Sequence, residues 1–144
     1  NGGLYYLVEK DGACVIENTQ LGITLSDIDF ANGGLSFLSC TTRQIDETYS
    51  LPGGSIKGAL RNHANELKLD VLKNSRQLTL YFRSYDDGIA YRYEAAGTGN
   101  ASITSEKSGF NLPENTSAWA SNWIKTYENP PTEKTYSNLL LEIF

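Results

Sequence analysis

Histidine, cysteine and methionine are scarce or missing in this chain, and the shortage excludes several kinds of functional site. The sequence contains one histidine, His63, two cysteines and no methionine. A zinc site needs clustered His, Cys or acidic residues at suitable spacing, and both cysteines lie far from His63. No G-x-S-x-G motif is present, so nothing indicates a serine nucleophile. We expect His63 to be a structural hydrogen-bonding group, with an interface or ligand contact as the alternative.

The two cysteines, Cys14 and Cys40, are too few to form a disulfide framework. Free cysteine is among the most frequently buried residue types, so we predict two buried thiols. A single bridge between Cys14 and Cys40 is the alternative in an oxidising compartment. The sequence leaves this choice open.

Basic runs and long apolar runs are also missing. The chain has 17 acidic and 12 basic residues, with a net charge of −5, which argues against a nucleic-acid partner. No apolar run reaches the roughly 18 residues that a membrane-spanning helix needs. The length of 144 residues corresponds to a single domain. Because the chain has no methionine and ends in the strand-like residues 139–144, we expect it to be part of a longer protein.

The clearest structural signal lies in residues 78–94, which read LTLYFRSYDDGIAYRYE. Apolar and polar side chains alternate on both sides of Asp86-Asp87-Gly88, which is the pattern of two strands with one buried face each. Asp-Gly supplies the positive φ that a tight hairpin turn needs. This segment therefore predicts a β-hairpin and sets the fold class as all-β.

Similar patterns predict about ten short strands, separated by turn signals every 8–12 residues. The expected strands cover residues 4–9, 13–17, 21–25, 35–49, 59–72, 78–83, 89–94, 101–110, 117–123 and 137–144. Residues 18–20, 27–34, 52–54, 112–116 and 127–134 are expected to be polar links or loops. This organisation is typical of an antiparallel β-sandwich.

Acidic residues are the first candidates for chemistry, because paired carboxylates hydrolyse glycosides. The candidates are Asp46, Glu47, Glu66, Asp86, Asp87 and Glu128. Sequence spacing does not show that any two of them face each other. Asp86 and Asp87 are more simply explained as turn residues, and Glu66 is predicted to form a salt bridge with Arg61 or Arg92. Asp27 and Asp29 form a D-x-D that lacks the rest of a calcium loop, which favours a solvated loop.

Aromatic residues near the C-terminal end provide a second candidate. Trp119, Trp123 and Tyr127 are suited to stacking on sugar rings, because flat apolar rings match the C–H faces of pyranoses. The alternative is that at least two of them pack into the core or against a neighbouring domain.

Four segments line up in order with one family pattern. They are residues 45–54 (IDETYSLPGG), 61–67 (RNHANEL), 82–93 (FRSYDDGIAYRY), and 110–113 (FNLP) followed by 118–120 (AWA). Together they resemble the N-terminal β-sandwich domain of glycoside hydrolase family 97. The segments at 4–6, 11–12 and 21–23 also fit, so the resemblance covers nearly the whole chain. The loop after Pro52 is blander than the family pattern, and residues 123–128 match only loosely.

The resemblance implies a specific organisation. Residues 1–144 correspond to a partial N-terminal domain with the galactose mutarotase-like supersandwich fold, truncated at its C-terminal end. A (β/α)8 barrel with the main catalytic carboxylates is expected to follow, so no catalytic residue is assigned here. The implied enzyme hydrolyses α-glucosides or α-galactosides and carries calcium at its active site. The glutamate that the sandwich lends to calcium aligns just past Phe144, so neither a metal ligand nor a cofactor is expected in this segment.

The expected partners and location follow from the same resemblance. The expected partners are the enzyme's own barrel and an oligosaccharide, with neither nucleic acid nor membrane. A bacterial, periplasmic or secreted location is expected, although this chain includes no signal peptide. Substrate-binding or interdomain roles are predicted, without a metal, for His63, Asn65, Glu66, Trp119, Trp123, Tyr127 and Glu128.

Two other functions remain open from the sequence. One is a stand-alone carbohydrate-binding module that uses Trp119, Trp123 and Tyr127. The other is a sugar epimerase of the mutarotase type, which needs a histidine and a carboxylate facing one pocket. His63 is the only candidate for that histidine.

Overall fold

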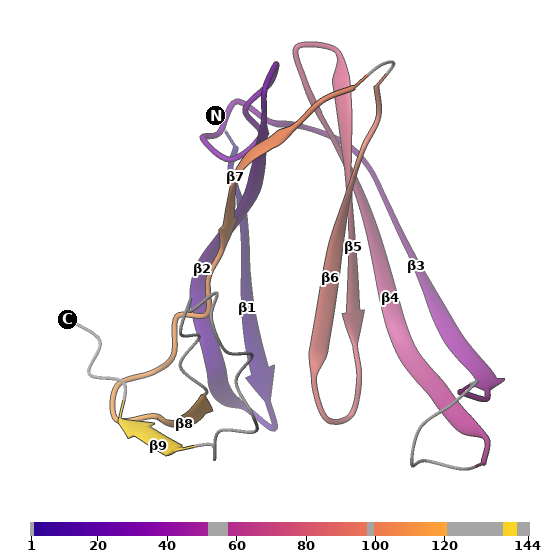
Figure 1. Ribbon diagram of the computed structural model, residues 1–144, viewed down its shortest axis with the longest axis vertical. Coiled ribbons are helices and arrows are strands. Elements are labelled where there is room, and N and C mark those ends of the chain that lie inside the picture. The colour runs from indigo at the N-terminus through magenta and orange to yellow at the C-terminus, as the bar shows by residue number, and fades with distance from the viewer. Residues whose placement is uncertain (1, 52–57, 98–99, 121–136, 141–144) are drawn as a thin grey trace, which may run out of the picture. The chain divides into compact units, whose positions relative to one another are not determined.

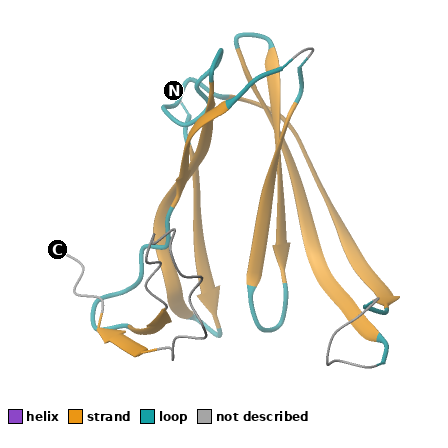
Figure 2. Ribbon diagram, viewed as in Figure 1, coloured by secondary structure: helices purple, strands orange, loops and turns teal. Residues whose placement is uncertain are grey.

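The computed structural model describes residues 2–51, 58–97, 100–120 and 137–140 (Figure 1). This part of the chain is all-β, with nine strands and no helix (Figure 2). The strands are β1 (Leu4–Lys10), β2 (Ala13–Leu25), β3 (Ser36–Tyr49), β4 (Leu60–Lys73), β5 (Arg76–Ser84), β6 (Ile89–Ala95), β7 (Ile103–Ser108), β8 (Ser117–Ala120) and β9 (Ser137–Leu140). No helix in the described residues is long and apolar enough to cross a membrane.

The chain divides into two compact units. The first contains residues 1–4 and 20–108, and the second contains residues 5–19 and 109–144. The main strand orders are β3-β4-β5-β6 and β1-β2-β7, both antiparallel sheets, in a sandwich-like fold. β2 is long enough to run through both units.

In the first unit, the four strands β3 to β6 follow one another as antiparallel neighbours. A two-residue turn joins β4 to β5, with φ of 49° at Asn74 and 63° at Ser75. Positive φ at both central residues gives the turn the twist that suits a hairpin. A register shift between Phe37 and Ser39 marks a bulge in β3.

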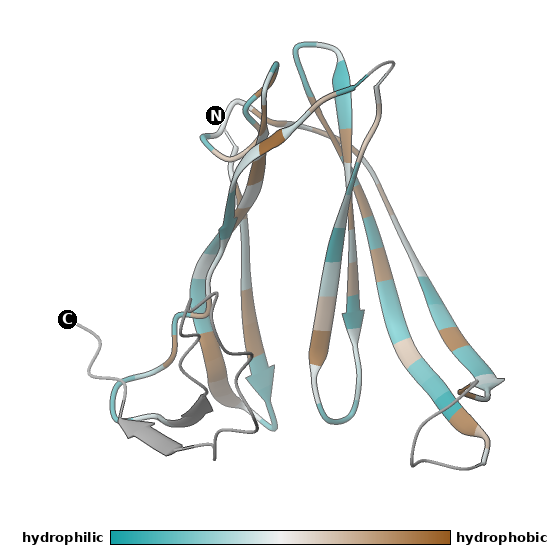
Figure 3. Cartoon of the chain, viewed as in Figure 1, coloured by the Kyte–Doolittle hydropathy of each residue, from teal (hydrophilic) through white to brown (hydrophobic). Residues whose placement is uncertain are grey.

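The two faces of this sheet differ in chemistry, and bands of opposite hydropathy alternate along its strands (Figure 3). Residues opposite each other in register share a face. The apolar face consists of three cross-strand rows: Leu67, Phe82 and Tyr91; Leu69, Leu80 and Tyr93; and Val71, Leu78 and Ala95. Leu78 is completely buried, and Val71 and Leu80 are 5% exposed. The opposite face carries most of the charged residues and is called the polar face below.

The second half of β2 joins this unit through Gly22. Its backbone N donates a 2.9 Å hydrogen bond to the Tyr93 hydroxyl. Burial raises the pKa of Tyr93 to about 12, so the phenol stays protonated at neutral pH. A Cβ at Gly22, whose φ is +155°, would lie 2.5 Å from the Ala31 Cα. Only glycine therefore fits here without displacing backbone, and the neighbouring Leu21 and Phe30 are buried.

The second unit is organised around the hairpin of β1 with the first half of β2. Its turn has φ of 53° at Asp11 and 80° at Gly12, as a tight hairpin turn requires. The Tyr6 hydroxyl donates to the Gly109 carbonyl at 2.7 Å. Thr19, which is 2% exposed, accepts a 3.0 Å hydrogen bond from the Asn111 backbone N. β8 and β9 pair as an antiparallel ribbon.

Most predicted elements are confirmed, including the all-β sandwich, the hairpin around residues 86–88 and the strand at 59–72. The predicted polar link at 18–20 is wrong, because β2 continues through it and Thr19 satisfies its hydroxyl locally. β7 is shorter than the predicted 101–110. The described strands near the end cover only 117–120 and 137–140, and the other predicted strand residues there lie outside the described part.

The predicted burial of the two cysteines is wrong. Cys14 and Cys40 are both exposed, and neither forms a disulfide in the structure. Cys40 lies on β3, which is an edge strand of its sheet, so a side chain there has a neighbouring strand on one side only. The burial preference of cysteine is a tendency that position in the sheet overrides.

Candidate functional site

The polar face of the β3–β6 sheet gathers the candidate site into three rungs of opposed side chains. The first rung is Arg43, Glu66 and Arg83; the second is Thr41, Lys68, Tyr81 and Arg92; the third is Ser39, Asp70, Thr79 and Glu94. Each rung exists because antiparallel register places these residues opposite one another on a single face. All of them lie in the first unit.

In the first rung, one glutamate is held between two arginines. Glu66 accepts from Arg43 Nε at 2.6 Å through Oε1 and from Arg83 Nε at 2.7 Å through Oε2. The Glu66 side chain is only 3% exposed, whereas those of Arg43 and Arg83 are 65% and 31% exposed. The hydrogen bonds from Arg43 and then Arg83 lower the pKa of Glu66 and outweigh its desolvation. Glu66 is therefore ionised at neutral pH and is not suited to act as a general acid.

In the third rung, Asp70 is held mainly by neutral donors. Its Oδ1 accepts from the Thr79 hydroxyl at 2.6 Å, and its Oδ2 accepts from the Ser39 hydroxyl at 2.7 Å. Gln77 also donates to Oδ1 at 2.9 Å, and Lys68 Nζ lies 3.4 Å from Oδ2. These bonds, chiefly those from Thr79 and Ser39, lower the pKa of Asp70 to about 2. This carboxylate also stays ionised at neutral pH.

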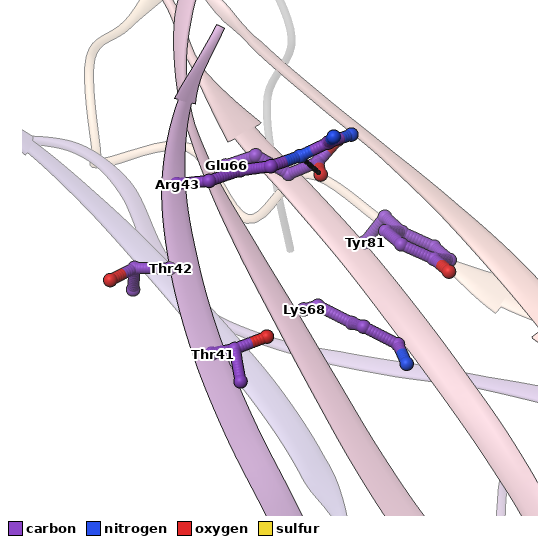
Figure 4. A pocket seen from close by; sticks show the side chains of 6 residues that line it. All are labelled: Thr41, Thr42, Arg43, Glu66, Lys68 and Tyr81. Carbon is purple, nitrogen blue, oxygen red and sulfur yellow. Dashed lines mark hydrogen bonds and ion pairs between the residues drawn. The ribbon is translucent and has the colours of Figure 1, made fainter.

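The second rung supplies cations and an aromatic ring. Arg92 lies over Tyr81, with Cζ 4.2 Å from the ring centroid, and Lys68 is opposite the same tyrosine in β4. A hollow of about 300 Å³ opens here (Figure 4), and it is lined by Thr41, Thr42, Arg43, Glu66, Lys68 and Tyr81. In Figure 4, Arg43 meets Glu66 while Lys68 and Tyr81 project from the next two strands.

Charge on this face is distributed unevenly. The first two rungs contain four cations, Arg43, Lys68, Arg83 and Arg92, and one carboxylate, Glu66. The third rung contributes two carboxylates, Asp70 and Glu94. The first two rungs thus form a positive patch on a chain whose net charge is −5.

The structure separates the predicted site residues that are closest in sequence. Glu66 lies in the first rung of the polar face, whereas His63 and Asn65 lie on the opposite face of β4. His63 is opposite Asp46, and its Nε2 is 3.5 Å from Gln44 Nε2. Asn65 helps to line a more apolar hollow of about 470 Å³ together with Leu67 and Phe82.

The side chains of the other predicted site residues lie outside the described part of the chain. Trp119 belongs to β8, where only the backbone is described. Trp123, Tyr127 and Glu128 lie outside the described residues. The stacking of this aromatic group on sugars therefore stays a prediction.

The predicted salt bridge from Glu66 to Arg61 or Arg92 is wrong in its partners. Arg61 is five residues before Glu66 in β4, and an odd offset places it on the other face of the strand. Arg61 instead donates twice to Asp46, both at 2.7 Å, and this arginine lowers the pKa of Asp46. Arg92 shares the polar face with Glu66 but lies in the next rung, over Tyr81.

Glu66 is the one residue of the three rungs that was predicted as a site residue, and four of those that were missed line the hollow or flank Glu66. They are Arg43, Lys68, Tyr81 and Arg83. Period-2 alternation already assigned Tyr81 and Arg83 to the polar side of their strand, which was the available signal. Their alignment with Arg43 depends on register between strands.

Metal binding finds no support in the described residues. Asp29 of the D-x-D uses Oδ1 to accept from the Ala31 backbone N at 2.8 Å and the Thr24 hydroxyl at 3.0 Å, and Oδ2 to accept from Asn32 Nδ2 at 2.7 Å. These bonds, led by that from the Asn32 side chain, lower its pKa to about 2. Asp27 pairs with Arg76. Within the described ranges, no group of three or more His, Cys, Asp or Glu residues could hold a metal.

Comparison with known proteins decides the family. The family model described as glycosyl-hydrolase 97 N-terminal matches residues 1–142. The chain belongs to this family. No curated protein matches the chain. The family 97 assignment agrees with the sandwich-like fold and covers both compact units.

Solved structures of family 97 enzymes share the fold. A variant from Pseudoalteromonas sp. strain K8 in complex with panose has a TM-score of 0.75 and 22% identity, over 96% of this chain and 22% of that one. An enzyme from the same strain in complex with acarbose has a TM-score of 0.75 and 23% identity, over 95% and 21%. A further variant from that strain has a TM-score of 0.73 and 22% identity, over 96% and 22%. The chain thus spans about a fifth of the length of these enzymes.

Proposed function

We propose that this family 97 N-terminal domain is a non-catalytic wall of an α-glycosidase, packed on a catalytic (β/α)8 barrel and shaping its active site. The family match over residues 1–142 carries the proposal. The polar face fits this role, because hydrogen bonds hold its buried carboxylates, Glu66 and Asp70, ionised, and neither is suited to act as the general acid that glycoside hydrolysis needs. A barrel enzyme has its active site at the loop face of its strands, where an added domain can exclude water.

We propose α-glucosides as the substrates in preference to α-galactosides. The support comes from the solved relatives, whose bound molecules are panose and acarbose. Both are oligosaccharides built around α-linked glucose-like rings. The residues that select the sugar would belong to the barrel.

Calcium dependence and location form further parts of the proposal. We place calcium at the active site of the enzyme, with the glutamate that the N-terminal sandwich lends to it just past Phe144. The described residues offer no cluster for a metal. The proposed location is periplasmic or secreted in a bacterium, where oligosaccharides from outside the cell are met first.

Hydrolysis assays on the full-length enzyme test the proposal. Aryl α-glucoside and aryl α-galactoside are each offered with and without a calcium chelator, and the 144-residue chain is assayed in parallel. We expect chelator-sensitive hydrolysis of the α-glucoside by the full-length enzyme alone. Absence of hydrolysis of either substrate would contradict the glycosidase assignment. Activity of the 144-residue chain would mean that its own residues are catalytic.

Isothermal titration calorimetry distinguishes the proposed function from that of a stand-alone carbohydrate-binding module. Titration of the 144-residue chain with maltooligosaccharides is expected to give no heat of binding, because the wall acts only beside the barrel. Clear binding would favour the module. No contact in the described residues favours the epimerase, since the carboxylate opposite His63 in register, Asp46, is already bound by Arg61.

A further inference from the structure

The cations of the polar face keep hydrogen-bonding capacity that their described contacts do not use. Arg43 reaches Glu66 through Nε alone, and a guanidinium has four further N–H donors. Lys68 has one described ion pair, to Asp70 at 3.4 Å, with its side chain 39% exposed. Arg92 is exposed over Tyr81 on the edge strand β6. Two of these donors, Arg43 and Lys68, line the hollow in Figure 4, and Arg92 lies over Tyr81, which also lines it.

These groups suit a carboxylate better than a neutral sugar. Sugar binding on a protein surface usually relies on an open aromatic face, but Tyr81 already has Arg92 over its ring and Lys68 opposite it in β4. Arginine and lysine bind carboxylates through short, charge-assisted hydrogen bonds. The face is also a broad surface of a sheet rather than a deep pocket, which matches a protein segment.

We propose that the first two rungs of the polar face dock an acidic segment, rich in Asp and Glu, from the part of the enzyme outside this domain. The positive patch stands on a chain of net charge −5, so charge complementarity selects an acidic occupant. This chain spans about a fifth of its solved relatives, which leaves most of such an enzyme available to supply that segment. The inference rests on the proposed function, because it takes the partner to be another part of the same glycosidase.

Zero-length cross-linking of the full-length enzyme tests the contact directly. A carbodiimide joins a lysine amine to a carboxylate only where the two touch, and mass spectrometry identifies the linked peptides. We expect Lys68 to be joined to an Asp or Glu outside residues 1–144. Lys107 on β7 is the internal control, because its described partners, Gln20 and Asn32, are neutral. Linkage of Lys68 only to Asp70, or equal linkage of Lys107 to outside carboxylates, overturns the proposal.

A pair of variants gives a second readout in the same full-length enzyme. Arg92→Gln removes a charge from the polar face, and the control Arg61→Gln removes one from the other face of the sheet. Arg61 has two 2.7 Å bonds to Asp46 within the domain, so a purely local role predicts the larger loss of Tm for Arg61→Gln. Docking predicts the larger loss for Arg92→Gln, shrinking at high salt because exposed charges are screened. The opposite order overturns the docking.

Glycosidase activity, measured on each preparation, distinguishes failure of the docking proposal from failure of the proposed function. An active enzyme without the Lys68 cross-link retains the proposed function and rejects the docking face. An inactive wild-type enzyme that still shows the cross-link rejects the proposed function, whereas the cross-link itself still supports the docking contact.

Discussion

The two faces of the β3–β6 sheet are built from the same strands but held by different forces. On the apolar face, Leu78, Leu80 and Val71 are removed from water and need no specific partner. On the polar face, Glu66 is just as buried at 3% exposed, yet it is stabilised only because two arginines reach it. The comparison teaches that burial on a sheet does not require apolar residues when register supplies matched charges.

Register matters differently for the two faces. An apolar residue tolerates several neighbours, whereas Glu66 needs Arg43 and Arg83 in the same rung. A buried charge that loses its partner is strongly destabilising, while a methylene that loses one contact is weakly so. The polar face therefore specifies how β3, β4 and β5 align, and the apolar face supplies most of the stabilising free energy.

The largest effect is expected from Leu78→Ala on the apolar face. Leu78 is fully buried, and a leucine-to-alanine change in a core costs about 2–5 kcal/mol through lost transfer energy and the cavity. Urea unfolding of the protein measures the loss. Thr41→Ala at an exposed position of β3 is the control and is expected to change little. Equal losses for both variants would show that the apolar face does not carry the stability.

Glu66→Gln is expected to lower the free energy of unfolding by about 1–3 kcal/mol, which is less than the effect of Leu78→Ala. The isosteric amide keeps the shape of the side chain but presents a donor to one of the two arginines, so that one hydrogen bond is lost. Asp46→Asn is the matched control, since Asp46 is also bound by an arginine but is 52% exposed. Its loss is expected to be smaller, because water can replace the missing bond. Unfolding free energies of both variants provide the comparison. A greater loss for Asp46→Asn would mean that burial does not set the value of these pairs.

The pH dependence of the folding stability tests the role of Asp70 in the third rung. The pKa of Asp70 is lowered from 3.8 to about 2 in the folded protein. A depressed folded pKa stabilises the protein above the unfolded value, and this stabilisation is lost as the pH falls from about 4 through about 2. We expect the stability difference between wild type and Asp70→Asn to be constant near neutral pH and to shrink over that interval. A difference that stays constant down to pH 2 would assign the effect to lost hydrogen bonds rather than to charge.

The sequence predicted the apolar face better than the polar face, and the reason is the range of the signal. Alternation and the Asp-Gly turn are local, so the hairpin of β5 and β6 could be read from consecutive residues. The partners of Glu66 come from two other strands, and Arg43 is 23 residues away in sequence. The odd spacing between Arg61 and Glu66 along β4 was enough to exclude Arg61 as a partner of Glu66. Choosing Arg43 and Arg83 required the register itself, which bulges such as that at Phe37 can shift by one residue.

The smallest effect is expected from Arg92→Gln measured in this chain alone. Its described contact is the cation–π interaction with Tyr81 at 4.2 Å, and an exposed interaction of this kind contributes about 0.5–1 kcal/mol. Arg92→Lys is the control that keeps the charge but loses the flat guanidinium. Urea unfolding should show a small loss for glutamine and a smaller one for lysine. A loss as large as that for Glu66→Gln would mean that the second rung, like the first, depends on charge pairing, and that the two faces differ less than their chemistry indicates.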